Sequence, residues 1–458
     1  MRRLRIVHAL HDFLPRHQAG SEIYAFELAR EQSRRHDVFV AAAEYDPATP
    51  HGTLRWRAFE GLPVIEIVNN WEFDRFEESY SSARINRQLG HVLDATRPDV
   101  LHIHNLLNLS FDLPRIARER GIASVATLHD YTLVCPSGGQ RVHVEEAHVC
   151  AEIDAARCSR CFGSSPFHAQ MVAGRLSRRA SARVAGQAAA LLRRRAPGLV
   201  QAAARRMDSG LEPGDIRKRL ACAMQVFENI DLCVAPSAAL ATEYARLGAA
   251  ADRIRVSDYG FRAEPGRPRV GRSGPLRIGF VGTLVWHKGP HILLQAVRRL
   301  SGAFELCVYG DPSVFPAYSA SLKELAAGLP VRFAGAFEHS RVAEVYGGLD
   351  VLVVPSLWPE NSPLVIHEAF MHGAAVVAAR MGGIPGLVVD RQNGLLYDPP
   401  SPESLARALQ QIVNDPALAT RLAARSPAVK SIEEDARQWD ERYCEVIGRP
   451  PAGAPVTP

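Results

Sequence analysis

The sequence predicts an α/β protein built from two doubly wound domains with parallel sheets. Short apolar runs typical of buried strands alternate with amphipathic stretches typical of helices, first over residues 4–134 and again from Leu276 onward. Between the two series, Arg262 to Pro275 is rich in Gly, Pro and Arg, which indicates a linker. At 458 residues the chain is also longer than one ordinary hydrophobic core supports.

The first domain is predicted from five apolar runs and two amphipathic stretches. Strands are expected at residues 4–10, 38–43, 64–68, 100–104 and 123–128, and helices at residues 21–34 and 84–96. In the first helix, Ile23, Phe26 and Ala29 share one face, and Ser21 is a candidate cap. The second helix is expected to end before Pro98, because the residue preceding a proline disfavours helical geometry.

The second domain repeats this alternation. Strands are expected at residues 276–282, 304–309, 331–334, 350–354 and 375–378, and helices at residues 403–413 and 432–446. The predicted organisation is 1–134 for the first domain, 135–225 for an insert with a cysteine cluster and basic helices, 226–262 for the end of the first domain, 263–275 for the linker, 276–430 for the second domain, 431–449 for a terminal helix and 450–458 for a disordered tail.

Composition indicates a soluble globular protein. Apolar residues make up 47% of the chain, charged residues make up 22%, and no window approaches the ~18 consecutive apolar residues of a spanning helix. The chain begins with basic residues, but its first apolar run is short and is interrupted by His8, so it predicts a strand rather than a signal peptide. We therefore expect a cytoplasmic location, with the eight cysteines reduced or bound to metal.

Two glutamates, Glu360 and Glu368, lie eight residues apart after the apolar run 350–354. Ser362 suits a helix N-cap, Pro363 suits the first helical position, and Gly373 marks the expected helix end. The free N–H groups and partial positive charge of a helix N-terminus suit a phosphate. The two carboxylates can accept hydrogen bonds from hydroxyl groups on either side. A phosphate site between two hydroxyl acceptors is the pattern of a nucleotide-sugar site.

These residues resemble the retaining glycosyltransferases of family 4, which have the GT-B fold. The shared pattern is Glu360-x7-Glu368, followed by the Gly-x-x-Val-Val run at 373–377 and the turn Gly382-Gly383. The resemblance implies two Rossmann-like domains facing a cleft, with a helical, cysteine-containing insert in the first and a terminal helix that crosses back to it. It also implies transfer of a sugar, with retention, from a UDP- or GDP-sugar to a glycan or lipid-linked glycan in polysaccharide or glycoconjugate biosynthesis.

The same resemblance suggests residue roles. Glu368 would bind the ribose, Glu360 the transferred sugar and Lys288 the diphosphate, so that no catalytic metal is required. Thr283 stands where the family often has arginine, and His129-Asp130 matches a family His-Asp pair whose histidine faces the cleft. The expected catalytic set is His129, Glu360 and Lys288, and the expected donor-binding set is Gly20, Gly282, Thr283, Lys288, Gly310, Asn361, Ser362, Leu364 and Glu368. We also expect His102, His104 and Asn105 to line the cleft.

Four cysteines fall within one short segment: Cys135, Cys150, Cys158 and Cys161. The last two form a C-x2-C pair, and four thiolates at such spacings suit a structural tetrahedral zinc site. His143 or His148 could replace one sulfur. Free thiols, an iron–sulfur cluster and disulfides are the alternatives, because spacing alone does not give ligand geometry.

The stretch from Arg175 to Arg219 is strongly basic, although the net charge of the whole chain is only +5. A helical basic segment can lie on an anionic membrane surface, which would suit an acceptor carried on a lipid and a position at the inner face of the membrane. A solvated helical hairpin is an equal alternative. Nucleic acid is not expected as a partner, because the cluster lacks the aromatic residues on which bases stack.

The sequence also allows two other functions. A sugar-nucleotide epimerase of the same fold would bind the donor without an acceptor, and the long insert in the first domain disfavours it. A non-catalytic, zinc-stapled adaptor for membranes or nucleic acid would not need Glu360, Glu368, Lys288 and His129 together.

Overall fold

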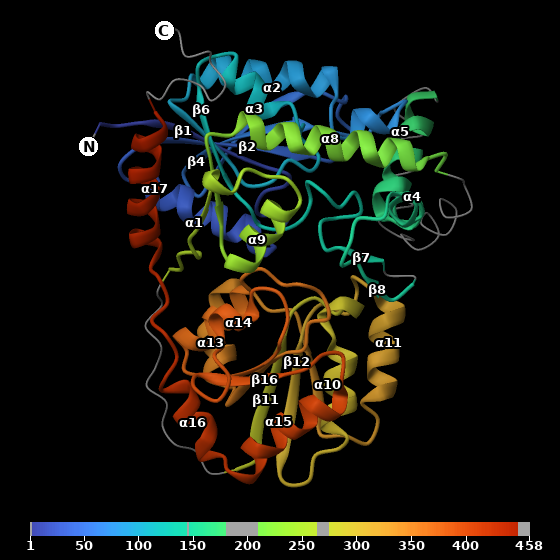
Figure 1. The fold of residues 1–458 in the computed structure, drawn as a ribbon, viewed down its shortest axis with the longest axis vertical. Coiled ribbons are helices and arrows are strands. Elements are labelled where there is room, and N and C mark those ends of the chain that lie inside the picture. The colour runs from blue at the N-terminus through green and yellow to red at the C-terminus, as the bar shows by residue number, and fades with distance from the viewer. Residues whose placement is uncertain (1, 144–145, 180–208, 263–273, 448–458) are drawn as a thin grey trace.

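The computed structural model describes residues 2–143, 146–179, 209–262 and 274–447, and it shows two α/β domains joined end to end (Figure 1). Each domain holds one large sheet with helices packed on it, so the predicted fold class is confirmed. The tail at 450–458 lies outside the described residues. Almost all of the linker at 263–275 and the centre of the basic segment, residues 180–208, lie outside them too.

The first domain is built on an eight-stranded sheet with the order β10-β9-β6-β5-β1-β2-β4-β3. All neighbours are parallel except β3 and β4, which form an antiparallel pair. The strands are β1 (Arg5–Leu10), β2 (Asp37–Glu44), β3 (Leu54–Phe59), β4 (Leu62–Val68), β5 (Val100–Ile103), β6 (Ala123–Thr127), β9 (Leu232–Ala235) and β10 (Ile254–Val256).

The sequence did not predict the edge strand β3, because its pattern mixes charge with apolar residues. Arg55 and Arg57 lie two residues apart on β3, so their side chains point to the same face. Both form ion pairs with the buried Glu66 of β4. Trp56 points the other way and is 56% exposed. The strand is therefore held to the sheet by charge pairing as well as by its backbone ladder.

Helices cover both faces of this sheet. They are α1 (Gly20–Gln32), α2 (Ala83–Thr96), α3 (Leu113–Arg118), α8 (Pro213–Asn229) and α9 (Ala238–Arg246). The cysteine-containing insert adds a short hairpin, β7 (Val142–His143) and β8 (His148–Val149), and the helices α4 (Ala155–Ser164) and α5 (Pro166–Arg179). Asp154 caps α4 through its carboxylate, and α4 packs against α8 at the side of the domain (Figure 1).

The second domain has a six-stranded, fully parallel sheet with the order β13-β12-β11-β14-β15-β16. Its strands are β11 (Leu276–Val281), β12 (Phe304–Tyr309), β13 (Val331–Gly335), β14 (Val351–Val354), β15 (Ala375–Ala379) and β16 (Gly394–Tyr397). Its helices are α10 (Pro290–Val297), α11 (Pro316–Leu325), α12 (Val342–Gly347), α13 (Leu364–Met371), α14 (Ile384–Leu387), α15 (Pro402–Asn414) and α16 (Ala417–Ala423). The central strands β14 and β15 are buried along their whole length, as their apolar sequences predict.

The terminal helix α17 (Ile432–Val446) returns to the first domain and lies against α1 (Figure 1). Its Asp435 is 1% exposed and accepts hydrogen bonds from the Tyr24 hydroxyl at 2.8 Å and from Lys430 Nζ at 2.6 Å. Trp439 donates its indole N–H to the same tyrosine hydroxyl at 3.0 Å. A buried polar network therefore fixes α17, the last helix that the structure describes, to α1.

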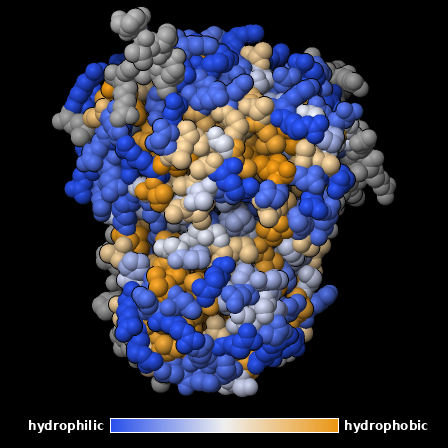
Figure 2. Space-filling model, in the orientation of Figure 1, coloured by the Kyte–Doolittle hydropathy of each residue, from blue (hydrophilic) through white to orange (hydrophobic). Residues whose placement is uncertain are grey.

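The molecular surface in Figure 2 is mostly hydrophilic on the outer parts of both domains, with hydrophobic side chains in several smaller patches. Among the helices that the structure describes, none is long and apolar enough to cross a membrane.

Replacing Asp435 by alanine is expected to lower the free energy of unfolding by about 3 kcal/mol, measured by chemical denaturation, because Lys430 and Tyr24 lose their buried acceptor. The matched control is Asp37→Ala, which removes an ion pair with Arg3 that is largely exposed, and it should change stability by less than about 1 kcal/mol. Equal stability of the two variants would show that this carboxylate does not hold α17.

Candidate active site

A cleft of about 620 Å³ lies between the two domains, at the carboxyl ends of strands from both sheets. The first domain contributes Gly20, His129 and Tyr259 to its wall, and the second contributes Lys288, Glu360 and other residues. All the predicted catalytic and donor-binding residues line this one cleft: His129, Glu360, Lys288, Gly20, Gly282, Thr283, Gly310, Asn361, Ser362, Leu364 and Glu368. The structure brings these residues together on one cleft, and their functional roles stay predictions.

The loop that carries Glu360 is held by the turn Gly382-Gly383. A Cβ on Gly383 would lie 1.7 Å from the backbone oxygen of Asn361, and one on Gly382 would lie 2.3 Å from that of Glu360. Gly382 also has φ +58°, a conformation that favours glycine. The Gly-Gly pair in the sequence is therefore required by the close approach of two backbones.

Glu360 and Lys288 are in direct contact. Lys288 Nζ donates to Glu360 Oε1 at 2.6 Å, and the Ser356 hydroxyl donates to the same oxygen at 2.7 Å. The carboxylate is 6% exposed and the lysine side chain 30%, so the ammonium remains open to the cleft. Lys288 Nζ also lies over the Trp358 ring, 5.2 Å from its centroid, in a cation–π contact.

Glu368 lies on α13 and is held by Tyr346 of α12. The tyrosine hydroxyl donates to Glu368 Oε2 at 2.6 Å. Burial raises the pKa of the Glu368 carboxyl, and this hydrogen bond acts in the opposite direction. Sequence reasoning missed Tyr346, because it is 22 residues from the glutamate and its own surroundings have no motif.

The start of α13 differs from the prediction by one residue. The helix begins at Leu364, and Pro363 occupies the N-cap position without a side-chain cap. Ser362 is not the cap, because its hydroxyl donates to Asp258 Oδ1 at 2.6 Å and lies 2.8 Å from His367 Nε2. The predicted helix end is right. Gly373 directly follows the C-cap residue His372 and has φ +67°, the left-handed conformation common after a helix end. Leu364 in turn lies beside Gly20, where an added Cβ would meet it at 3.0 Å.

His129 follows β6 and forms hydrogen bonds through both ring nitrogens. Its Nε2 lies 3.1 Å from His104 Nδ1, and its Nδ1 lies 2.9 Å from the Tyr259 hydroxyl. Burial lowers the pKa of His129 to about 3, with a smaller contribution from His11, so the ring is neutral at pH 7. The Asn361 side chain donates to the backbone oxygen of His129 and so joins the two walls of the cleft.

The prediction that His102, His104 and Asn105 line the cleft is wrong. Their exposed fractions are 0%, 3% and 6%, and none of them lies on the cleft wall. β5 is a central strand, and α17 covers the face on which His102 lies, with the Tyr443 hydroxyl 2.7 Å from His102 Nδ1. That cover comes from a helix more than 300 residues away, which the local pattern could not reveal.

The four clustered cysteines are all half-buried. The pKa of the Cys158 thiol is raised to about 12, mainly by burial and further by the nearby Cys135, Cys150 and Cys161. The four side chains are therefore neighbours. Among the described residues, the groups with three ligand atoms within 4.8 Å of one another are His8, His102 and His104, and His11, Asp12 and Glu22. No three of the four cysteine sulfurs form such a group among these residues.

Family models match both domains. One, described as Glycosyltransferase Family 4, matches residues 19–185, and another, Glycosyl transferases group 1, matches residues 267–429. The D-inositol 3-phosphate glycosyltransferase of Xylanimonas cellulosilytica is 32% identical over 54% of this chain and 66% of that enzyme. The lipopolysaccharide core biosynthesis glycosyltransferase LpsE of Rhizobium meliloti is 37% identical over 32% of this chain and 42% of that protein. The chain thus spans no more than about two thirds of these relatives.

Solved structures share the whole fold. Anabaena HepE, crystallised with UDP and glucose, superposes with a TM-score of 0.63 at 16% identity, covering 96% of this chain and 100% of that one. Sucrose-phosphate synthase of Thermosynechococcus elongatus gives 0.66 at 18% identity, covering 97% and 99%. Family models match both domains, and the solved structures share the two-domain architecture. The chain therefore belongs to the family 4, group 1 glycosyltransferases of GT-B fold.

Proposed function

We propose that the protein is a retaining glycosyltransferase that moves a hexosyl or related sugar from a nucleotide diphosphate sugar to a glycan or lipid-linked glycan. The observation that carries this proposal is the Lys288–Glu360 pair beside the first turn of α13, with Glu368 on the same helix and all three facing one cleft. The site thus combines a cation, free backbone N–H groups and two carboxylates within the reach of one ligand.

The chief chemical task is to stabilise negative charge on the departing diphosphate. An ammonium group has three N–H donors, so Lys288 can keep its bond to Glu360 and still donate to a phosphate oxygen. The N–H groups of Leu364 and Val365, in the first turn of α13, have no partner within the helix and add partial positive charge. Together these groups can act without a catalytic metal. Glu360 accepts hydrogen bonds from the transferred sugar, and Glu368 accepts them from the ribose.

A UDP-sugar is the favoured donor, with a GDP-sugar as the alternative. Anabaena HepE, which shares the fold, was crystallised with UDP and with UDP-glucose. For the acceptor, we propose a glycan or lipid-linked glycan bound on the first-domain side of the cleft, in polysaccharide or glycoconjugate biosynthesis at the inner face of the cytoplasmic membrane. The basic segment from Arg175 to Arg219 would provide peripheral membrane contact, and no nucleic acid is involved.

Incubation with UDP-, GDP- and dTDP-sugars, each with and without polyprenyl-diphosphate glycans, is expected to release nucleoside diphosphate from one donor. The glycosidic bond of the product should have the same axial or equatorial orientation as the bond in the donor. Glu360→Gln should lower kcat about 100-fold, because removing one electrostatic contact to the reacting sugar costs ~3 kcal/mol. The matched control is Glu344→Gln on α12, an exposed glutamate paired with Arg341, which should retain full activity.

Neither turnover nor a thermal shift with any donor in this panel would refute the donor site and favour a non-catalytic adaptor. Turnover of the donor into an isomeric nucleotide sugar, without an acceptor, would identify an epimerase instead. Inversion at the anomeric carbon would overturn the retaining mechanism.

Glu368→Gln is expected to weaken donor binding by about tenfold to 100-fold, because charge-assisted hydrogen bonds contribute ~1.5–3 kcal/mol. Isothermal titration with the preferred donor measures this. Tyr346→Phe should weaken binding less, since it frees Glu368 to move but keeps its carboxyl group. If both variants bound the donor as tightly as the wild type, Glu368 would not contact the ribose.

We further propose that Cys135, Cys150, Cys158 and Cys161 bind a structural zinc ion. Cys158 and Cys161 lie one turn apart on α4, so their side chains share a helix face. Cys135 and Cys150 come from the flanking segments. A tetrahedral site with Zn–S bonds of ~2.3 Å would bring the four sulfurs together around one ion.

Elemental analysis of the purified protein is expected to find about one zinc per chain, because four thiolates complete a structural site. Cys158→Ser should lose the metal, while Cys444→Ser, an exposed cysteine on α17, should keep it. Iron with visible absorbance would indicate a cluster instead. The chain has eight cysteines, so eight titratable thiols without metal would indicate free cysteines, and only four would indicate disulfides within the cluster. Either result would exclude zinc.

A further inference from the structure

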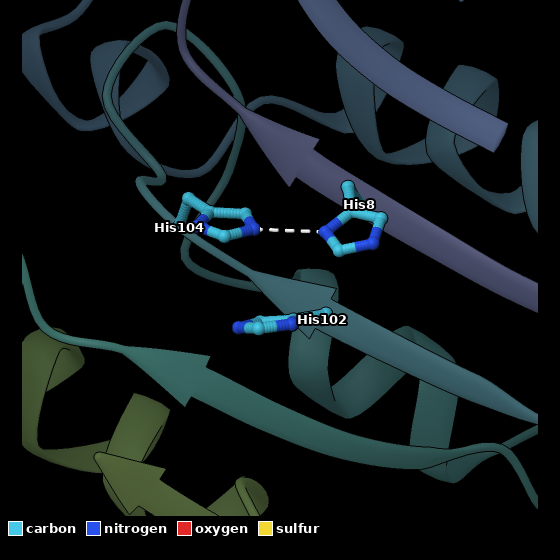
Figure 3. Close-up of side chains that lie close together, drawn as sticks. All are labelled: His8, His102 and His104. Atoms are coloured by element: carbon cyan, nitrogen blue, oxygen red, sulfur yellow. Dashed lines mark hydrogen bonds between the residues drawn. The ribbon is translucent and has the colours of Figure 1, made fainter. Parts of the chain in front are cut away.

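Three buried histidines, His8, His102 and His104, lie together in the core of the first domain (Figure 3). His8 and His102 are direct partners in the β1–β5 ladder, and His104 follows β5. Their rings approach one another to centroid separations of 4.3–5.2 Å. The proposed catalytic set includes only His129, so the purpose of these three imidazoles needs a separate explanation.

A metal site is one explanation, because three imidazoles can bind zinc. Each of the six ring nitrogens, however, already has a hydrogen-bonding partner within the protein. The partners are His104 Nε2 and Gln32 Oε1 for His8, the Tyr443 and Thr127 hydroxyls for His102, and His8 Nδ1 and His129 Nε2 for His104. This arrangement describes a hydrogen-bonded network rather than a set of free ligands.

Part of the network runs as an unbranched row from the core to the cleft. Gln32 Oε1 lies 2.9 Å from His8 Nε2, and His8 Nδ1 lies 2.9 Å from His104 Nε2. His104 Nδ1 lies 3.1 Å from His129 Nε2, and His129 Nδ1 lies 2.9 Å from the hydroxyl of Tyr259, which lines the cleft. The row thus connects a glutamine at the end of α1 to the predicted catalytic histidine.

All the imidazoles in the row are neutral. Burial lowers the pKa of His8 to about 4 and moves the pKa of His104 well below its usual value, and nearby histidines reinforce the effect on His104. A neutral imidazole has one N–H donor and one acceptor nitrogen. Each link therefore fixes the next, and the orientation of one end group sets the tautomer of every ring in the row.

Gln32 is that end group. Its Nε2 donates to the Tyr443 hydroxyl at 3.2 Å, so its oxygen faces His8 and accepts from His8 Nε2–H. His8 Nδ1 must then accept from His104 Nε2–H, and His104 Nδ1 must accept from His129 Nε2–H. His129 Nδ1 is left to accept from the Tyr259 hydroxyl.

We propose that Gln32, His8 and His104 are positioning residues that hold His129 in its Nε2–H tautomer and leave Nδ1, on the side of Tyr259 and the cleft, as a hydrogen-bond acceptor. For catalysis this rests on the proposed function. A neutral ring with its lone pair toward the cleft suits a transferred sugar that gains positive charge in the transition state, and it can accept a hydrogen bond from a sugar hydroxyl that replaces Tyr259.

The first test is the tautomer itself, which does not depend on activity. In the full-length protein labelled with ¹⁵N-histidine, the signals of His129 are identified by comparison with His129→Gln. The wild type is expected to carry its proton on Nε2 of His129. A proton on Nδ1, or a doubly protonated ring at pH 7, would overturn the proposal even if the enzyme is active.

The second test breaks the row at its far end. Gln32→Leu should give His129 a mixture of tautomers and lower kcat about tenfold, with the KM for the donor within about twofold of the wild type. The matched control is Thr127→Val, which also removes a buried hydrogen bond to an imidazole, that of His102, outside the row. It should leave the His129 tautomer and kcat unchanged.

If Gln32→Leu kept the wild-type tautomer, or if Thr127→Val disturbed it equally, the row would be structural only and the proposal would fail. If no donor is turned over at all, the proposed function fails, while the tautomer measurement still decides whether the row orients His129.

Discussion

The arrangement of the cleft depends on the close packing of the Gly382-Gly383 turn against the loop before α13. Because the turn has no side chains, its backbone meets the backbone of Glu360 and Asn361 directly. That contact sets the position of the loop that carries Glu360 and Asn361. Glu360 consequently meets Lys288, and Asn361 reaches the opposite wall at His129. A larger side chain in the turn would have to displace all of these contacts together.

The contacts across the cleft and those of α17 act on the same elements. Asp258, near the end of the first domain, accepts from Ser362 of the second, while the adjacent segment at Gly260 donates to Asp435 of α17. The connection between the domains is therefore tied both to the donor loop and to the terminal helix. These contacts fix the two walls relative to each other, so that side chains from both domains can contact one substrate.

The fold and most cleft residues could be predicted from sequence because their signals are local. Glu360, Glu368 and Gly382-Gly383 lie within 24 residues of one another and follow one buried strand. The residues that sequence missed act at long range: Tyr346 holds Glu368, and Tyr259 lies 130 residues from His129. The capping prediction at Ser362 failed for the same reason, since a distant carboxylate binds its hydroxyl.

The two walls of the cleft differ in charge. The second domain presents an ammonium, Lys288, whose neighbour Glu360 is almost completely buried. The first domain presents His129, whose row of buried imidazoles cannot easily take up a proton, because burial and mutual repulsion both disfavour the charged form. Among the described residues that line the cleft, Lys288 is the one lysine or arginine, and it lies on the wall where a diphosphate would leave. A cation on the opposite wall would instead attract the diphosphate away from the position in which its departure is assisted, and it would oppose the positive charge that develops on the sugar.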